Sequence, residues 1–128
     1  MGHKKMAPLG DLQLRIMKVL WDHGEASVGG VLEEVSPSGE LAYTTIATML
    51  RKLETKGLVG HRIEGRSFIY RAKVKEEEVT RSMANHFVDR LFEGSLTEVV
   101  SHLLNTREVS KGELDILEQL IAERKKGI

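Results

Sequence analysis

Residues 41–71 read LAYTTIATMLRKLETKGLVGHRIEGRSFIYR, and the spacing of apolar residues changes within this stretch from a helical to a strand-like period. The first half repeats apolar residues at helical spacing, whereas the second half alternates apolar and polar residues. Gly65 lies where a tight hairpin turn needs a positive φ. The pattern predicts, in order, a helix from about Tyr43 to Lys56, Gly57 at its C-terminal end, a strand at 58–63, a turn at 64–66 and a second strand at 67–71.

Two further helices are predicted upstream of this stretch. The first runs from Leu9 to about His23, and the second is short and has Ser27 as a candidate N-cap. The run Ser36–Gly39 interrupts the chain before the third helix. Three helices followed by a β-hairpin is the element order of a winged helix-turn-helix, which we predict for residues 1–73.

From Lys75 onward the pattern is helical again, with three amphipathic segments and no further strand signal. About 50 residues of this kind make a marginal core, so residues 74–128 are predicted to form a helical dimerisation domain. Packing of this region on the N-terminal half of the same chain is the alternative. The candidate dimerisation residues are the apolar positions Val79, Met83, Phe87, Leu91, Leu96, Val100, Leu103, Leu117, Leu120 and Ile121. The predicted fold class is therefore mainly α with a small β-hairpin.

The third helix carries side chains suited to a DNA groove. A major groove about 12 Å wide admits one helix, and hydroxyl and methyl groups near the start of that helix can contact base edges. Thr44, Thr45 and Thr48 supply such groups, while Arg51 and Lys52 follow one turn later and can reach phosphates. Arg66 lies at the expected hairpin tip, where it can meet phosphates or a minor groove.

The charge distribution points in the same direction. The whole chain has a formal net charge of zero, but residues 41–73 contain seven basic and two acidic residues. A local positive excess in a neutral chain suggests an anionic partner such as nucleic acid. A winged-helix module that binds another protein is the alternative, although such a surface does not require this excess.

Several other classes of protein find no support in the sequence. There is no cysteine, which excludes disulfide scaffolds and thiolate chemistry. No apolar run approaches the roughly 20 residues that span a bilayer, and no secretion signal is visible, so we expect a cytoplasmic protein without direct membrane insertion.

No phosphate-binding loop or nucleophile motif indicates an enzyme or a cofactor. Glu98 and His102 have i,i+4 spacing but are better explained as a surface pair than as metal ligands.

The chain also resembles the penicillinase/methicillinase repressor (BlaI/MecI) family of bacterial winged-helix regulators. The resemblance covers nearly the whole chain after Pro8 and is carried by LGDL at 9–12, IMKVLW at 16–21, LAYTTIATMLRKL at 41–53, KGLV at 56–59 and GRSFIY at 65–70. It implies a homodimeric repressor of a pseudo-palindromic double-stranded DNA operator. It further implies that Thr44, Thr45 and Thr48 face bases, with Tyr43, Arg51 and Arg66 supporting backbone or groove contacts.

The resemblance also bears on how repression ends. In β-lactam-responsive members a membrane sensor protease leads to cleavage of the repressor in its dimerisation region, at an Asn–Phe bond in the best-known members. Here His102–Leu103 stands at that place, so it is the candidate cleavage position although the Asn–Phe pair is missing. The copper-responsive branch uses C-terminal cysteines, which this chain lacks.

Overall fold

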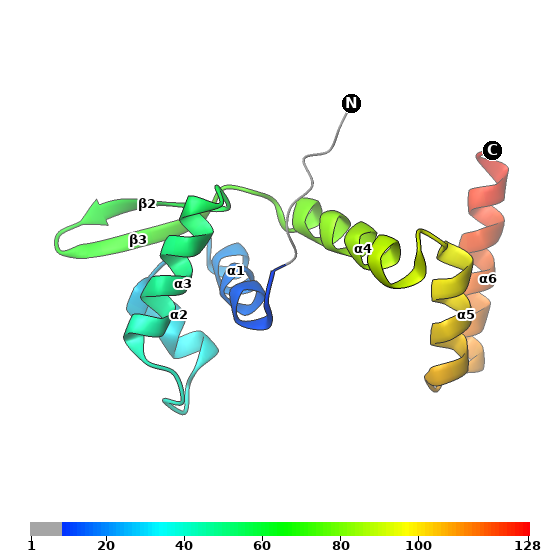
Figure 1. Cartoon of the computed structure of the whole chain (residues 1–128), viewed down its shortest axis with the longest axis horizontal. Helices are drawn as coiled ribbons and strands as arrows, with labels where there is room; N and C mark the ends of the chain where they lie inside the picture. Colours follow the sequence, from blue (N-terminus) through cyan, green and yellow to red (C-terminus); the bar gives the residue numbers. More distant parts are fainter. Residues whose placement is uncertain (1–8) are drawn as a thin grey trace. The chain divides into compact units, whose positions relative to one another are not determined.

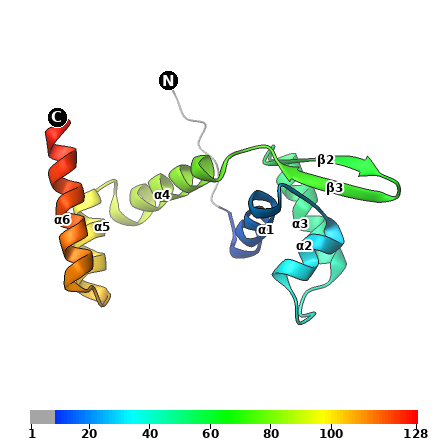
Figure 2. The same cartoon turned by 180° about the vertical axis from the view of Figure 1, so that it is seen from behind.

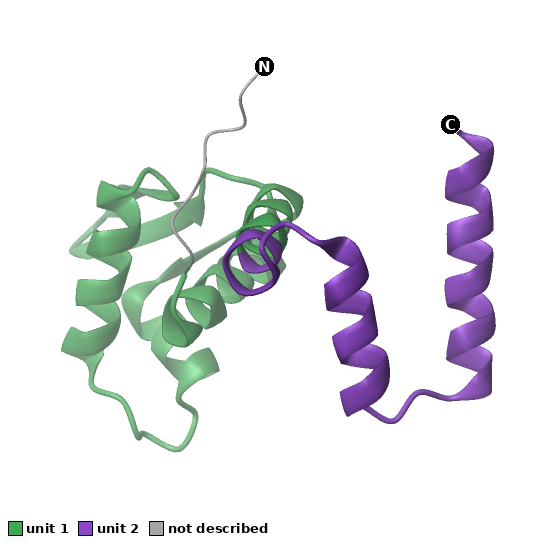
Figure 3. Ribbon diagram, turned by 45° about the vertical axis from the view of Figure 1, so that its right-hand side comes forward, with its two compact units in different colours: residues 1–86 green, residues 87–128 purple. Residues whose placement is uncertain are grey.

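The computed structural model describes residues 9–128; residues 1–8, which the predicted N-terminal domain also included, lie outside the described part. Figures 1 and 2 show the elements from opposite sides. In chain order they are α1 (Asp11–His23), β1 (Glu25–Ser27), α2 (Val28–Val35), α3 (Tyr43–Thr55), β2 (Val59–Glu64), β3 (Ser67–Ala72), α4 (Glu76–Phe92), α5 (Leu96–Thr106) and α6 (Lys111–Lys126). The described residues form two compact units, 9–86 and 87–128, which are coloured separately in Figure 3.

The first unit is a winged helix, which confirms the predicted fold class. Three helices precede an antiparallel hairpin, β2–β3, that projects from them as the wing (Figure 1). β1 adds a third strand, and the sheet has the order β1-β3-β2. Tyr70 of the central strand β3 lies opposite Ala26 of β1 and opposite His61 of β2.

Local signals in the sequence fix the ends of these elements. The Oγ atom of Ser27 accepts a hydrogen bond from the backbone N–H of Gly30 at 3.0 Å, as expected of an N-cap of α2. Gly57 follows α3 with φ +81°, and Gly65 makes the wing turn with φ +62°. Both conformations are strained for residues with a Cβ atom.

One hydrophobic core holds the first unit together. α1 and α3 contribute most of its fully buried side chains, and Tyr70 of β3 is its largest member, 2% exposed. The fully buried residues on these two helices and on β2 and β3 are Ile16, Met17, Leu20, Ile46, Leu50, Leu53, Val59 and Tyr70. The indole Nε1 of Trp21 also donates to the carbonyl oxygen of Val74 at 2.9 Å, which ties the segment after β3 to α1.

The first turns of α4 belong to this core. Val79 is 2% exposed and is a member of the core cluster, and Met83 packs against the cluster. Both are candidate dimerisation residues; within the single chain they contact the core of the first unit, and a role in a dimer interface stays a prediction. The predicted division at residue 73 precedes α4, whereas the compact units divide within α4, because its first turns contribute apolar side chains to the winged helix.

The second unit has very little core of its own. Within residues 87–128, all of which the structure describes, Val99 is the one buried hydrophobic residue. Ser95 and Ser110 cap α5 and α6 by accepting from the N–H groups of Glu98 and Glu113 at 3.1 and 3.0 Å. The exposed large apolar side chains include Phe87, Leu91, Leu96, Val100, Leu103, Leu104, Leu114, Ile116, Leu120 and Ile121.

The placement of Val79 leads to a prediction about stability. Replacing Val79 by Ala should lower the free energy of unfolding by about 2 kcal/mol, since two buried methyl groups are lost and a small cavity remains. Thr80→Ala, at the adjacent exposed position, is the control and should cost far less. Urea denaturation at two protein concentrations measures both. A loss that depends on protein concentration would contradict this placement and return Val79 to an interface between chains.

Candidate nucleic-acid interface

α3 has one buried face and one polar face. Ile46, Leu50 and Leu53 are fully buried at helical spacing, which fixes the rotation of the helix about its axis. The opposite side therefore carries the polar residues of the helix. Thr44, Arg51, Lys52 and Thr55 are exposed there, and Thr45 and Thr48 are partly exposed. Tyr43 is exposed as well, as the first residue of the helix.

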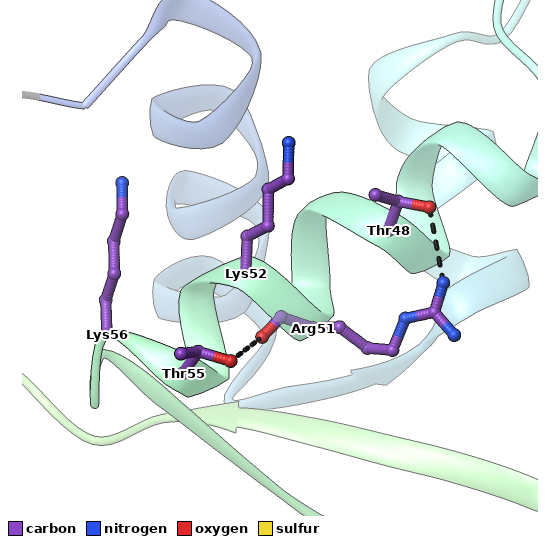
Figure 4. Close-up of a pocket in the computed structure, with 5 residues that line it drawn as sticks. All are labelled: Thr48, Arg51, Lys52, Thr55 and Lys56. Carbon is purple, nitrogen blue, oxygen red and sulfur yellow. Dashed lines mark hydrogen bonds between the residues drawn. The ribbon is translucent and has the colours of Figure 1, made fainter.

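A shallow hollow lies on this polar face. Figure 4 shows its lining side chains, which are Thr48, Arg51, Lys52, Thr55 and Lys56. A guanidinium nitrogen of Arg51 donates to Oγ1 of Thr48 at 3.3 Å, and Oγ1 of Thr55 donates to the carbonyl oxygen of Arg51 at 3.0 Å. The hollow thus combines three cations with two hydroxyl groups, a set that suits the phosphates and base edges of a nucleic acid.

Thr55 and Lys56 were not predicted as contact residues. Each lies four residues after a predicted contact residue, Arg51 and Lys52 respectively, so helical spacing alone could have found them. The ammonium group of Lys56 lies 3.5 Å from Oε1 of Gln13 on α1. Among the predicted contact residues, the structure gathers those from Tyr43 to Lys52 on α3 and leaves Arg66 apart, at the wing turn.

The segment that leads into α3 is fixed by Ser36. This serine is 4% exposed, and its hydroxyl accepts from the backbone N–H of Leu41 at 2.9 Å. The same hydroxyl donates to a carboxylate oxygen of Glu40 at 3.0 Å. A buried hydroxyl with both roles filled orders the turn after α2, and so it sets where α3 begins.

The basic residues of the wing differ in how they are paired. Arg62 contacts carboxylate oxygens of Glu25 at 2.7 Å and Glu64 at 2.8 Å. The hydrogen bond from Arg62 lowers the pKa of the Glu25 carboxyl below its ordinary value, because it stabilises the charged form. Arg66 is exposed, and within residues 9–128 no ion pair forms at its side chain. Arg66 is therefore a cation at the wing tip that is available to an anionic partner.

The described residues also bear on metal and membrane sites. Among residues 9–128 no group of three or more His, Asp or Glu side chains is arranged to hold a metal ion. Glu98 and His102 both lie on α5, and the His102 ring lies 5.7 Å from that of Phe92. No helix in this part of the chain combines the length and apolar character needed to cross a membrane.

The fold and the polar face of α3 define a winged-helix protein of the nucleic-acid-binding class. A family model described as "Penicillinase repressor" matches residues 9–123. The penicillinase repressor of Bacillus licheniformis is 32% identical over 122 residues, which cover 95% of each chain. The chain therefore belongs to the penicillinase repressor family, whose members are transcriptional repressors and not enzymes.

Two further comparisons agree with this assignment. The transcriptional regulator BlaI of Mycobacterium tuberculosis (strain CDC 1551 / Oshkosh) is 32% identical over 126 residues, covering 96% of this chain and 89% of that protein. The solution structure of the monomeric form of Bacillus licheniformis BlaI in complex with the blaP half-operator matches with a TM-score of 0.50 and 36% identity. That match covers 59% of this chain and 93% of the solved one.

Proposed function

We propose that this chain is a dimeric transcriptional repressor that binds a pseudo-palindromic DNA operator in the cytoplasm. The observation that carries the proposal is the polar face of α3, where three cations and two hydroxyl groups surround one hollow. A related winged helix, at 36% identity, has been solved in complex with a half-operator, which supports DNA as the partner of this surface.

In the proposed complex α3 lies in the major groove. Thr44, Thr45 and Thr48 contact base edges, while Arg51, Lys52 and Lys56 contact phosphates along the groove walls. Tyr43, which is 56% exposed at the start of the helix, contacts the backbone. Arg66 extends from the wing to flanking phosphates or to the minor groove.

The direct test is selection of bound sequences from a random double-stranded DNA pool at physiological salt. An enriched inverted repeat supports a dimeric, sequence-specific regulator, because two-fold symmetry in the protein is mirrored in its site. Binding should also weaken steeply with salt, as release of counterions from phosphates requires. Recovery of unselected DNA, or of none, contradicts the proposal and favours a winged-helix module that binds protein.

Substitutions should separate base contacts from phosphate contacts. Thr44→Ala or Thr48→Ala should reduce discrimination between the selected site and its single-base variants by about 1–3 kcal/mol. Arg66→Ala should instead weaken binding to all sequences and lower the salt dependence by about one counterion. Fluorescence anisotropy measures both effects.

The control for these variants is Lys18→Ala, which removes an exposed cation from α1 that lies 4.0 Å from Glu76. It should leave affinity, discrimination and salt dependence unchanged. Full discrimination in both threonine variants would contradict the assignment of α3 as the helix that contacts bases.

The proposed dimer rests on the second unit. Its apolar side chains are largely exposed in a single chain, and one buried valine cannot stabilise three helical segments in water. A second copy that packs on the same faces supplies the missing core with closed two-fold symmetry. Within that unit, the candidate residues that are exposed or partly exposed are Phe87, Leu91, Leu96, Val100, Leu103, Leu117, Leu120 and Ile121.

Charge introduced into this surface should dissociate the dimer. Leu120 is 61% exposed, and Leu120→Asp should weaken self-association by about tenfold or more, because burying an unpaired carboxylate is costly. Gln119→Asp places the same charge at the preceding position, which is also exposed, and is the control. Light scattering across micromolar concentrations measures the mass of each. A wild-type chain that is monomeric throughout, or equal effects of the two substitutions, would contradict the proposed interface.

Relief of repression by a membrane sensor protease is the remaining part of the proposal. His102 and Leu103 lie inside α5, where the carbonyl oxygen of His102 accepts a hydrogen bond from the Thr106 hydroxyl at 2.8 Å. A protease binds extended backbone, so cutting this bond requires local opening of α5. Mass spectrometry of the chain from cells exposed to a β-lactam should show fragments 1–102 and 103–128, absent from untreated cells. An intact chain, or a cut elsewhere, would exclude this position.

A further inference from the structure

The wing consists of a supported base and an unsupported tip. β1 pairs with β3 only from Ile69 to Arg71, so the three-stranded part of the sheet ends there. Beyond it β2 and β3 pair only with each other, through Ile63 with Phe68 and Glu64 with Ser67. These four residues and the turn between them are all exposed. Because a two-stranded hairpin is marginally stable in water, the core alone does not hold the tip in one direction.

On one face of the wing, a histidine links the hairpin to α3. Nδ1 of His61 lies 2.8 and 2.9 Å from the two carboxylate oxygens of Glu54, which is in the last turn of α3. The His61 ring also stacks on the Phe68 ring, with centroids 4.3 Å apart and planes 8° from parallel. Phe68 is only two residues from Arg66. A continuous series of contacts therefore runs from α3 to the wing tip.

On the opposite face, Arg62 links the hairpin to β1. Successive side chains of a strand point to opposite faces, so Arg62 and His61 lie on different sides of the sheet. Arg62 pairs with Glu25 of β1 at 2.7 Å and with Glu64, next to the turn, at 2.8 Å. Each face of the wing thus has one side-chain tie to a neighbouring element and one side-chain contact toward the tip.

We propose that these two ties, Glu54–His61 and Glu25–Arg62, fix the inclination of the wing and thereby place Arg66 against DNA. The four residues are positioning residues that act through Arg66, an inference that rests on the proposed function of the wing. Glu25 and Glu54 would otherwise be unfavourable near phosphates. Their pairing accounts for two carboxylates beside the proposed interface, because Arg62 offsets the charge of Glu25 and His61 engages the carboxylate of Glu54.

Such ties need not be strong to matter. Exposed pairs of this kind contribute little to the stability of a folded domain. A marginal hairpin, however, is sensitive to small biases, and holding a contact residue in its bound position reduces the ordering cost of binding. The effect is therefore expected in DNA affinity more than in the unfolding transition.

A double-mutant cycle with Arg66 tests the proposal on the full chain. His61→Ala should reduce affinity for the selected operator by roughly two- to tenfold, and Glu25→Ala should act in the same direction. In an Arg66→Ala background the same substitutions should cause almost no further loss, because the group they position is gone. Arg81→Ala breaks a matched exposed pair on α4, with Glu77 at 3.0 Å, and should leave affinity unchanged in both backgrounds.

Equal losses in the two backgrounds would overturn the proposal, since His61 would then act on DNA directly or through general stability. No loss in either background would overturn it as well. Amide ¹⁵N relaxation of the free protein gives a separate readout: His61→Ala should increase the motion of residues 63–68 and leave α3 unchanged. If the wild-type chain binds no DNA, the proposed function fails, while unchanged relaxation in the variant would still show that the ties do not hold the wing.

Discussion

The burial of one stripe of α3 is the constraint on which the rest of the interface depends. Ile46, Leu50 and Leu53 are inaccessible to solvent, so the helix cannot rotate about its axis without exposing them. Every polar residue out of phase with this stripe is consequently presented to solvent. Val59 and Tyr70 bury the base of the wing in the same core, which joins the helix to the base of the hairpin. One side of α3 thus packs in the core, and the other side carries the candidate contact residues.

The parts of the fold that could be predicted from the sequence are those with local signals. The change of period, a serine N-cap and two glycines at positive φ located α2, α3 and the hairpin to within a residue or two. The pairing of β1 with β3 had no such signal, because three residues carry no readable alternation and the partner lies more than forty residues away. α4 shows a related limit. Its apolar stripe looks the same whether a residue such as Val79 meets the core of its own chain or a partner.

The candidate site was predictable in position but not in its charges. Counting residues over 41–73 gave a positive excess that included Arg62, yet this side chain is held by two carboxylates. One of those carboxylates, Glu25, lies outside the counted stretch and becomes a neighbour only through the pairing of β1 with β3. Lys56, by contrast, lines the hollow although it was not predicted as a contact residue. Charge composition therefore locates a region, whereas the fold decides which cations are available.

The second unit raises a different physical question, that of helices with almost no core of their own. If they pair with a second copy, as proposed, their folding and their association are one equilibrium, and the order of α5 and α6 depends on chain concentration. Operator binding by two linked winged helices then gains from the high effective concentration of the second half-site. A cut within α5 would remove both advantages together, because the core of the dimer and the link between the half-sites are made of the same side chains.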